Sequence, residues 1–184
     1  TFIAKNYNCS VDAITISKEQ YEYASQKIQN EGLSEKVSVI FRDYRDIKKN
    51  YSNIVSIEMF EAVGKKYWRN YFDTIRNSLN DSGVAALQVI TIDENKARDY
   101  QNRPDFIQQY IFPGGMLPTK KQFEYSAKQV GLKCIENLSF GVSYAKTLKM
   151  WNKQFQKSWN ELSKFGYDIK FKRMWEFYLS YCET

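Results

Sequence analysis

Short apolar runs that alternate with segments of helical periodicity constrain the fold of this chain more than any other feature of its sequence. The apolar runs lie at residues 10–17, 36–44, 53–59 and 83–92. Ser17 and Gln20 form a capping box directly after the first run, and the helical segment that follows ends near Gly32. A second helical segment begins near Lys65 and continues to the polar residues 80–83. This alternation is typical of an α/β domain with a parallel sheet and helices on both faces.

The sequence changes character at Asp93. Residues 93–118 are first polar, then aromatic, and then rich in Pro and Gly, which favours an inserted lid over another strand and helix. Thr119 and Gln122 form a second capping box, and the short helix that they begin ends at Gly131. The remaining predicted elements are a strand at 132–141, a helix at 144–164 and a helix that opens at Asp168. We expect one domain over residues 1–184, with residues 93–118 as its lid.

The composition is that of an ordinary globular domain, with 43% hydrophobic and 26% charged residues. No apolar run approaches the roughly 20 residues that a membrane-spanning helix needs. The three cysteines are far apart and the chain contains no histidine, so we predict no metal site. Unpaired cysteines favour a reducing compartment, and we therefore expect a cytoplasmic protein.

The net charge of +6 and the pI of about 9.0 favour a negatively charged partner, either nucleic acid or an anionic membrane surface. Lys and Arg are scattered, and no nucleic-acid-binding module is present in the sequence, so we expect no nucleic-acid partner. Aromatic residues concentrate after residue 140 at helical spacing. That spacing fits a hydrophobic core, and it fits equally an apolar pocket for a long ligand.

Polar residues follow each predicted strand, where the ligand crevice of an open α/β sheet lies. They are Ser17, the residues from Arg42 to Tyr44, Glu58, Glu61, and the residues from Gln88 to Thr91. Ser17 and Gln20 either present hydroxyl and amide groups to a nucleoside or only cap their helix. Asp43 and Tyr44 either bind an adenine or belong to a solvated turn.

Glu58 and Glu61 are the candidate acid–base pair. If they share a helical turn, their spacing of three residues places both on one face. Two carboxylates held that close in a crevice raise the pKa of one of them, which suits a general acid or base. The same pair also fits a first helical turn whose acids offset the helix N-terminus.

Six sequence blocks carry a family resemblance that covers essentially the whole chain. They read ITISKEQYEYA, DYRDI, IVSIEMFEAVGKKYWRNYF, FIQQYIFPGGMLP, FGVSYAKTLKMW and RMWEFYLSYC. In this order and spacing they are similar to the cyclopropane-fatty-acyl-phospholipid synthases, a family that includes the mycolic acid cyclopropane synthases. The resemblance implies a Rossmann-like class I methyltransferase that uses S-adenosylmethionine. It further implies methyl transfer to the double bond of an unsaturated phospholipid acyl chain, after which a bound bicarbonate takes a proton and a cyclopropane closes.

The resemblance also implies roles for individual residues. The residues expected at the cofactor are Thr15, Ile16, Ser17, Gln20, Asp43, Tyr44 and Arg45. Those expected at bicarbonate are Ile57, Glu61 and Tyr144. The catalytic set is Glu61, Gln88, Tyr144 and Cys182. Cys182 matches a cysteine of the family's last block, and we expect a buried structural role for it because nothing basic adjoins it.

Two departures limit what the resemblance implies. Gln88 stands where the family usually has a histidine, and an amide can donate a hydrogen bond but cannot titrate. We therefore expect methyl addition, with either a ring or a methyl branch as the product. The chain also begins after the family's glycine-rich loop and stops before its last strand, so we expect a fragment that is incomplete at both ends and binds the cofactor poorly.

The resemblance places the enzyme at phospholipid acyl chains on the inner membrane face and leaves a homodimer open. A small-molecule methyltransferase on the same fold is one alternative, since a fold does not determine its substrate. A non-catalytic protein that binds lipid surfaces is another, because the loss of the histidine also fits lost activity.

Overall fold

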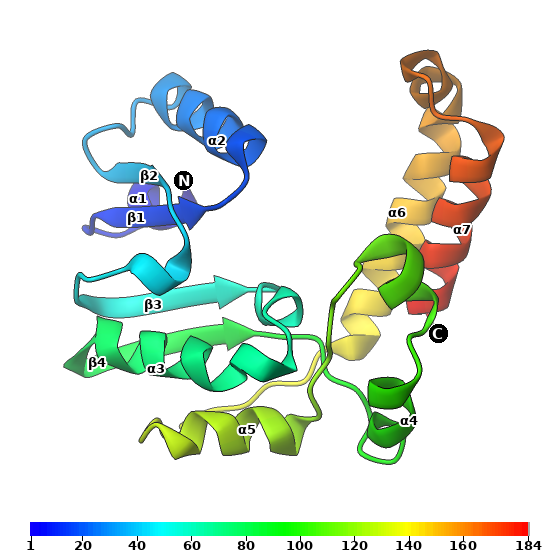
Figure 1. Cartoon of the computed structure of the whole chain (residues 1–184). Helices are drawn as coiled ribbons and strands as arrows, with labels where there is room; N and C mark the ends of the chain where they lie inside the picture. Colours follow the sequence, from blue (N-terminus) through cyan, green and yellow to red (C-terminus); the bar gives the residue numbers. More distant parts are fainter. Residues whose placement is uncertain (184) are drawn as a thin grey trace. The chain divides into compact units, whose positions relative to one another are not determined.

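The structure is a computed structural model that describes residues 1–183. These residues divide into two compact units. Unit 1 comprises Thr1–Ile90 and Tyr125–Leu132, and unit 2 comprises Thr91–Glu124 and the chain from Lys133 onward. Figure 1 shows the helices and strands of both units. The assignments of residues 1–184 to one domain and of 93–118 to a lid stay predictions.

Unit 1 contains two pairs of parallel strands. Strand β1 (Val11–Thr15) pairs with β2 (Val37–Phe41), and β3 (Tyr51–Ile57) pairs with β4 (Leu79–Gln88). The predicted α/β architecture with parallel strands is thus confirmed, although the four strands form two separate two-stranded sheets. Both pairs run in register to their carboxyl ends, so the residues that follow β1 and β2, or β3 and β4, lie at a common edge.

Three helices flank these strands in Figure 1. They are α1 (Phe2–Asn6), α2 (Lys18–Asn30) and α3 (Trp68–Ser78). The Ser17 hydroxyl caps α2 as predicted, because its Oγ accepts a hydrogen bond of 3.2 Å from the Gln20 amide. Ala4, Ile28 and Val37 from α1, α2 and β2 form a buried core under the first strand pair.

Strand β4 begins four residues earlier than predicted, at Leu79. The polar residues 80–83, which were expected to form a turn, instead lie inside the strand where its register with β3 shifts. Gly83 makes this possible, since a Cβ there would lie only 3.1 Å from the Ser52 carbonyl oxygen. The irregular pairing therefore depends on a residue without a side chain.

A buried aromatic cluster supports the carboxyl end of β3. Phe60 lies in a 3₁₀ turn (Phe60–Ala62) directly after the strand, and its ring stacks on Trp68 at a centroid distance of 5.3 Å. The Phe60 ring also meets the edge of Tyr71 at 5.0 Å and tilts against Phe72 at 5.6 Å. Because Phe60 and Phe72 are almost completely buried, this cluster holds the adjoining Glu58 and Glu61 segment in place.

Helix α5 (Lys120–Gln129) begins with the predicted capping box. The backbone amide of Gln122 donates to the Thr119 hydroxyl at 3.1 Å, and the backbone amide of Thr119 donates to the Gln122 side-chain oxygen at 3.0 Å. This reciprocal pair satisfies two amide groups that the helix itself leaves without partners.

Unit 2 is built around a hairpin of two long helices. Helix α6 (Gly141–Leu162) and helix α7 (Ile169–Glu183) pack along each other, and a 3₁₀ turn (Ser163–Phe165) joins them. Leu148, Phe155 and Leu179 are the buried centre of this hairpin. Residues 93–118 contain the short helix α4 (Ala97–Asn102) and a π-helical turn (Ile107–Ile111).

The prediction of a strand at residues 132–141 is wrong. Residues 133–140 form no regular element and are all exposed, including Ile135 at 75% and Leu138 at 79% of their full surface. The alternation of apolar residues in this segment fits a strand. Among the described residues, however, the segment pairs with no strand, so it forms no ladder of backbone hydrogen bonds. Helix α6 therefore begins at Gly141, three residues before the predicted start.

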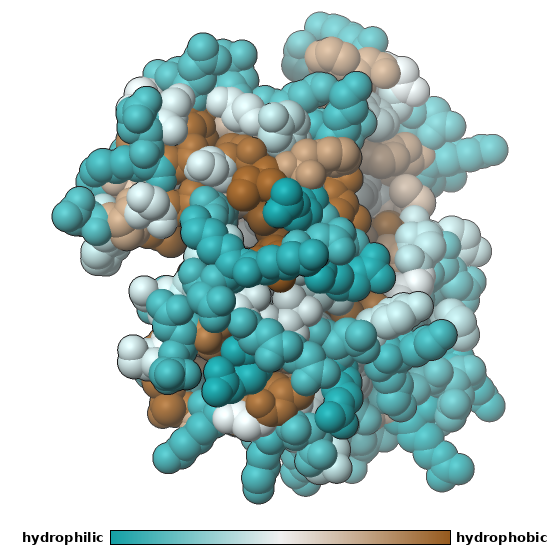
Figure 2. Space-filling view, turned by 60° about the vertical axis from the view of Figure 1, so that its left-hand side comes forward, coloured by the Kyte–Doolittle hydropathy of each residue, from teal (hydrophilic) through white to brown (hydrophobic). Residues whose placement is uncertain are grey.

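Hydrophobic residues also reach the surface of the molecule. Figure 2 shows them as patches among hydrophilic side chains. Within residues 1–183, no helix is long and apolar enough to cross a membrane.

Candidate functional site

Glu58 and Gln88 meet at the carboxyl ends of β3 and β4. The Glu58 amide donates to the Gln88 carbonyl at 3.0 Å, and the Gln88 side-chain Nε2 donates to Glu58 Oε1 at 2.9 Å. Glu58 also has a φ of 49°, a left-handed conformation that costs a residue with a Cβ roughly 1 kcal/mol. The amide of Gln88, where the resemblance leads us to expect a histidine, is therefore bonded to a carboxylate rather than left free.

Glu61 is the most deeply buried acid of this edge. Its Oε1 accepts a hydrogen bond of 2.6 Å from the Ile90 amide, while its Oε2 is buried and has no partner among the described residues. Burial raises the pKa of Glu61, and the charge of Glu58 adds to this, although the amide bonds oppose both effects. Glu61 thus has the properties of a carboxyl group that can hold a proton and present it.

Two further residues belong to this edge: Tyr71, which the sequence did not single out as a site residue, and Ile57, which it did. Tyr71 donates from its hydroxyl to Ser56 Oγ at 2.8 Å, and burial raises the pKa of Tyr71 to about 12. Ile57, which was predicted at bicarbonate, ends β3 and is 55% exposed. Only the fold brings Tyr71 beneath β3, so its contact with Ser56 could not be read from spacing.

The carboxyl end of β1 brings together the predicted cofactor residues of the first block. The Thr15 hydroxyl donates to Gln20 Oε1 at 2.6 Å and accepts from the Ser17 amide at 3.1 Å. Ile16 lies between them with 71% of its surface exposed. The turn therefore presents hydroxyl and amide groups and an exposed apolar side chain at the N-terminus of α2.

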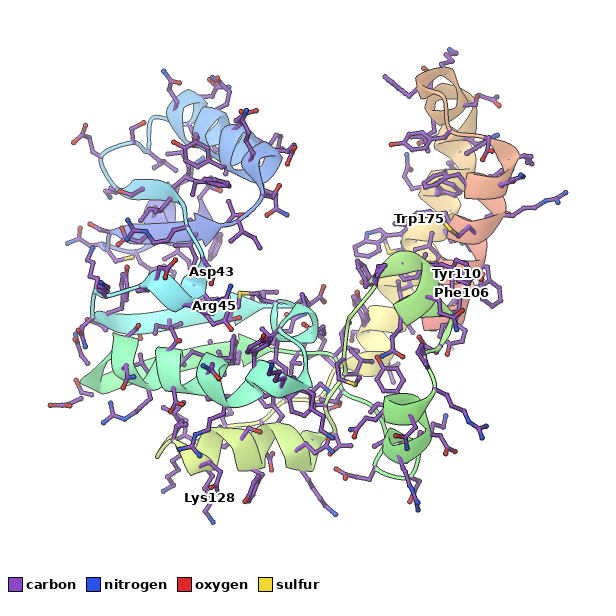
Figure 3. All side chains as sticks on the ribbon, in the orientation of Figure 1. Asp43, Arg45, Phe106, Tyr110, Lys128 and Trp175 are labelled. Carbon is purple, nitrogen blue, oxygen red and sulfur yellow. The ribbon has the colours of Figure 1, made fainter. Side chains whose placement is uncertain are left out.

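Asp43, Tyr44 and Arg45 follow β2 (Figure 3). Arg45 binds both carboxylate oxygens of Asp43, at 2.9 Å from Nε and 2.7 Å from Nη2. The hydrogen bond from Arg45 is the largest of the effects that hold the pKa of Asp43 below its ordinary value. Tyr44 is partly buried against the ring of Tyr71 at 5.9 Å, so Tyr44 offers a ring face whereas Asp43 is already occupied.

A further cluster joins the two strand pairs of unit 1. Asp12 Oδ2 accepts from Lys49 Nζ at 2.8 Å and from the Tyr51 hydroxyl at 2.9 Å. The hydrogen bond from Lys49 lowers the pKa of Asp12, and Tyr51 adds to this effect. A small cavity beside these residues is lined in part by Ile14 and Ile47. One oxygen of Asp12 is thus engaged in a structural contact that the sequence did not reveal.

Tyr144 and Cys182 belong to unit 2. Tyr144 lies in the first turn of α6, packs against the α6–α7 core and meets the ring of Trp151 edge-on at 6.3 Å. Cys182 lies against the same core, and burial, with the charge of Asp105, raises its pKa to about 11. Cys182 therefore has the character of a packed thiol rather than a nucleophile. That Tyr144 joins Glu61 in one site stays a prediction.

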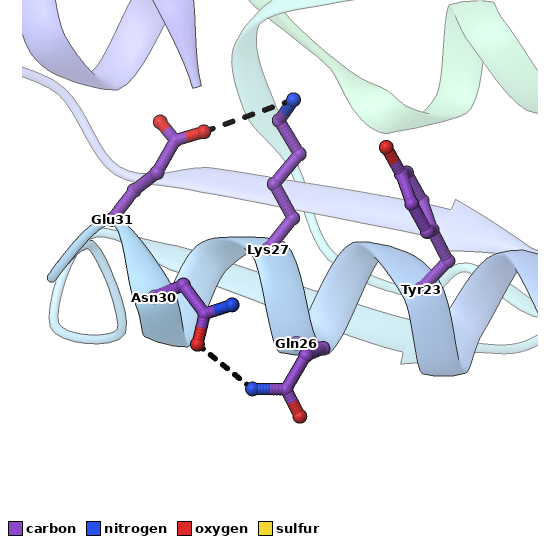
Figure 4. A pocket seen from close by; sticks show the side chains of 5 residues that line it. All are labelled: Tyr23, Gln26, Lys27, Asn30 and Glu31. Atoms are coloured by element: carbon purple, nitrogen blue, oxygen red, sulfur yellow. Dashed lines mark hydrogen bonds and ion pairs between the residues drawn. The ribbon is translucent and has the colours of Figure 1, made fainter.

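Metal ligands and one surface depression are two other candidate bases of a site within residues 1–183. The described residues contain no group of three Asp, Glu or Cys side chains that could hold a metal ion. A depression on the outer face of α2 is lined by Tyr23, Gln26, Lys27, Asn30 and Glu31 (Figure 4). Its residues form a Lys27–Glu31 ion pair of 3.8 Å and a Gln26–Asn30 hydrogen bond of 2.8 Å, and Glu31 also pairs with Lys5 at 2.9 Å. These are ordinary surface contacts.

The chain as a whole is similar to known proteins. The model of the family "Mycolic acid cyclopropane synthetase" matches residues 1–184. A tuberculostearic acid methyltransferase from Mycobacterium tuberculosis is 35% identical over 175 residues, which are 95% of this chain and 41% of that protein. A cyclopropane-fatty-acyl-phospholipid synthase from Escherichia coli is 36% identical over 182 residues, which are 98% of this chain and 45% of that protein. The chain thus spans less than half the length of these two curated relatives.

The fold is likewise that of a solved structure. The crystal structure of a mycolic acid cyclopropane synthase in complex with SAH and CTAB superposes with a TM-score of 0.88. The superposition covers 98% of this chain and 66% of the other, at 24% identity. The predicted methyltransferase fold, of which the two strand pairs and their helices are a part, is therefore confirmed.

Proposed function

Because the chain belongs to the mycolic acid cyclopropane synthetase family, we propose that its protein transfers a one-carbon group from S-adenosylmethionine to the double bond of an unsaturated phospholipid acyl chain. The product is a cyclopropane or methyl-branched fatty acid. One observation supports this proposal above the others: Glu61 combines a buried, unpartnered oxygen with a raised pKa at the strand end where the family has its acidic motif. A curated relative is named for each of the two product types.

The edge that follows β1 and β2 fits S-adenosylmethionine. This cofactor would supply a methyl group on a sulfonium, and its ribose and adenine need hydroxyl, amide and aromatic partners. Thr15 and Gln20 already form a polar pair at the N-terminus of α2, and Tyr44 offers a partly buried ring. Asp43 fits less well than expected, because both of its oxygens accept from Arg45. We assign ribose and adenine contacts to Thr15, Gln20 and Tyr44, and a supporting contact to Asp43.

The edge that follows β3 and β4 fits an anionic base such as bicarbonate. A protonated Glu61 can donate from Oε2 to an oxygen of that anion, and the raised pKa of Glu61 favours the protonated form. An ionised Glu61 would instead repel it. Tyr144 is the second proposed donor, and Ile57 the proposed backbone contact. The role of Cys182 is to pack the α6–α7 hairpin.

Gln88 bears on which product forms. Its Nε2 donates to Glu58, and an amide accepts no proton near neutral pH, so this position cannot relay a proton from the cation that methyl addition leaves. If the added methyl group loses its proton slowly, the cation can instead lose a proton from a neighbouring carbon, which gives a methyl- or methylene-branched unsaturated chain beside the ring. The ratio of the two products therefore reports on Gln88.

The proposal also includes association of the protein with a membrane. The substrate chains belong to phospholipids, and a net charge of +6 suits the anionic inner face of a membrane, where we propose that a cytoplasmic enzyme of this kind acts. A homodimer remains compatible with this arrangement.

Transfer of a labelled methyl group tests the proposal in the purified complete protein. With labelled S-adenosylmethionine and vesicles of unsaturated phospholipid, label is expected in the lipid fraction. Label in soluble amines but not in lipid would favour the small-molecule methyltransferase. No binding of S-adenosylmethionine in calorimetry would favour the non-catalytic lipid-binding protein. A Glu61→Leu variant, which has neither an acceptor nor a donor at this position, with unchanged transfer would remove the assigned role of Glu61.

A further inference from the structure

The turn between α6 and α7 has an exposed surface that the proposed function does not use. We define the α6–α7 tip as residues 163–170, of which every one is exposed. Phe165 has 81% of its surface in solvent, which is the largest value among the exposed large hydrophobic residues of the described chain. Tyr167 and Ile169 add 45% and 55% exposure to the same tip. Three large apolar side chains thus lie within five consecutive residues at the end of a hairpin.

Positive charge surrounds these apolar residues. Between residues 157 and 173 the chain carries five Lys or Arg residues and only two acidic ones. Lys164 and Lys170 lie within the tip itself and are exposed. The Lys164 ammonium is 2.9 Å from Glu161, but both side chains are about 70% exposed, so this pair is weak and can exchange for another anion. Asp168 is occupied as a cap, since it accepts from the Phe171 amide at 2.8 Å.

The hairpin holds the tip rigidly. Tyr167 packs on Phe171 at a centroid distance of 4.5 Å, and Phe171 stacks on Trp175 at 5.7 Å, so the aromatic ladder of α7 extends into the turn. Gly166 adopts a φ of 92°, which ends the turn and directs the chain into α7. The tip therefore needs no folding on contact with a partner, and an exposed Phe165 costs little conformational entropy to bury.

We propose that the α6–α7 tip docks on an anionic lipid surface, with Phe165 in the headgroup region and Lys164 and Lys170 at the phosphates. An apolar residue flanked by lysines is the pattern of an interfacial anchor, because the ring leaves water while the ammonium groups stay at the charged layer. The lipid, rather than a protein, is the occupant that this charge pattern favours. The inference rests on the proposed function in one respect, since that function requires access to lipid in a membrane.

Vesicle flotation of the complete protein tests this. The test variant is Phe165→Ser with Lys170→Ser, and the matched control is Tyr23→Ser with Lys18→Ser, which removes one exposed aromatic ring and one exposed charge from α2. We expect the wild type to bind phosphatidylglycerol vesicles and not phosphatidylcholine vesicles, and to lose binding as salt rises. The affinity of the test variant for these vesicles should be lower by about tenfold or more, and the control should bind as the wild type does.

A second measurement uses the fluorescence of an added indole. In a Phe165→Trp variant, phosphatidylglycerol vesicles should shift the emission to shorter wavelength, whereas a Tyr23→Trp variant should show no added shift. Absence of vesicle binding by the wild type would overturn the proposal, as would equal binding by the test variant and the control. Circular dichroism checks that both double variants stay folded.

Turnover separates this inference from the proposed function. The test variant should lose methyl transfer to lipid in vesicles and keep it on lipid dispersed in a neutral detergent. If the protein binds vesicles through the tip but transfers no methyl group to lipid in vesicles or in detergent, the proposed function is contradicted and the docking of the tip is supported. If it transfers methyl groups but its vesicle binding does not depend on the tip, only the docking of the tip is contradicted.

Discussion

Gln88 donates a hydrogen bond of 2.9 Å from its side-chain amide to the carboxylate of Glu58, across the carboxyl ends of β4 and β3. This contact joins the residue that replaces the family's histidine to the residue with the left-handed backbone. Two features that are separate in the sequence are therefore one feature of the site. The first two predictions test each partner of this pair in turn.

Replacing Glu58 with glycine should stabilise the protein. The φ of 49° costs a residue with a Cβ about 1 kcal/mol, and glycine adopts it freely. Because the exposed hydrogen bond from Gln88 is lost, the net gain in the free energy of unfolding should be about 0.5 kcal/mol. Denaturant unfolding measures it. A Glu58→Ala variant is the control, since it removes the carboxylate but keeps the strain, and a gain equal to that of glycine would contradict the account.

Replacing Gln88 with histidine should raise the ring content of the methylated lipid. The imidazole can take a proton at neutral pH, which the amide cannot. We expect the ratio of cyclopropane to branched product to increase by about tenfold or more, as measured by gas chromatography of the fatty acid methyl esters. Gln88→Asn, a second amide, should leave the ratio unchanged. An equal ratio in the wild type and the histidine variant would show that this position relays no proton.

Replacing Glu61 with glutamine should make stability less dependent on pH. Because burial raises the pKa of Glu61 above its ordinary value of 4.5, the folded protein holds this proton more tightly than the unfolded chain. Stability therefore falls as the pH rises from the ordinary to the raised value, and the loss persists above that window. The glutamine variant lacks this loss, so it should be the more stable protein at neutral pH, with no advantage below pH 4.5.

Thermal unfolding of both proteins between acid and neutral pH measures the effect. The glutamine keeps an oxygen for the Ile90 amide, so the comparison isolates the charge. An advantage that is the same at all pH values would contradict a Glu61 whose pKa is raised by burial.

Cys182 should react slowly with thiol reagents. A rise of its pKa from 9.0 to about 11 lowers the thiolate fraction at neutral pH about 100-fold, and burial limits access further. Mass spectrometry after timed alkylation should find Cys9 and Cys134, which are exposed, modified well before Cys182. In denaturant all three should react at similar rates. Early modification of Cys182 in the folded protein would contradict its role in packing.

Much of the fold could be predicted because its signals are local. The capping boxes predicted at Ser17 and Thr119 involve residues three apart. The box at Thr119 is complete, whereas at Ser17 only the hydroxyl cap forms, because the Ser17 backbone amide donates to Thr15 instead of Gln20. The apolar runs predicted all four strands, because apolar and β-branched side chains favour strands even where, as at Val55 and Ile57, they stay exposed. The strand expected at 132–141 failed for the opposite reason, since a strand also needs a partner, and no local pattern reveals one.

The candidate site was predictable in its membership more than in its contacts. Topology alone placed Glu58, Glu61 and Gln88 at one edge of the strands. The hydrogen bond from the Ile90 amide to Glu61, the engagement of Asp43 by Arg45 and the left-handed φ of Glu58 depend on how distant segments meet. Such contacts arise from packing, which spacing along the chain does not determine.

Mass spectrometry of membrane lipids tests the central claim most directly. The complete protein is expressed in cells that make no cyclopropane fatty acids, and their phospholipids are compared with those of cells carrying an empty vector. The account predicts phospholipids that are heavier by one methylene, with the added carbon at the former double bond. Unchanged phospholipids in cells that contain the folded protein and ample S-adenosylmethionine would contradict it.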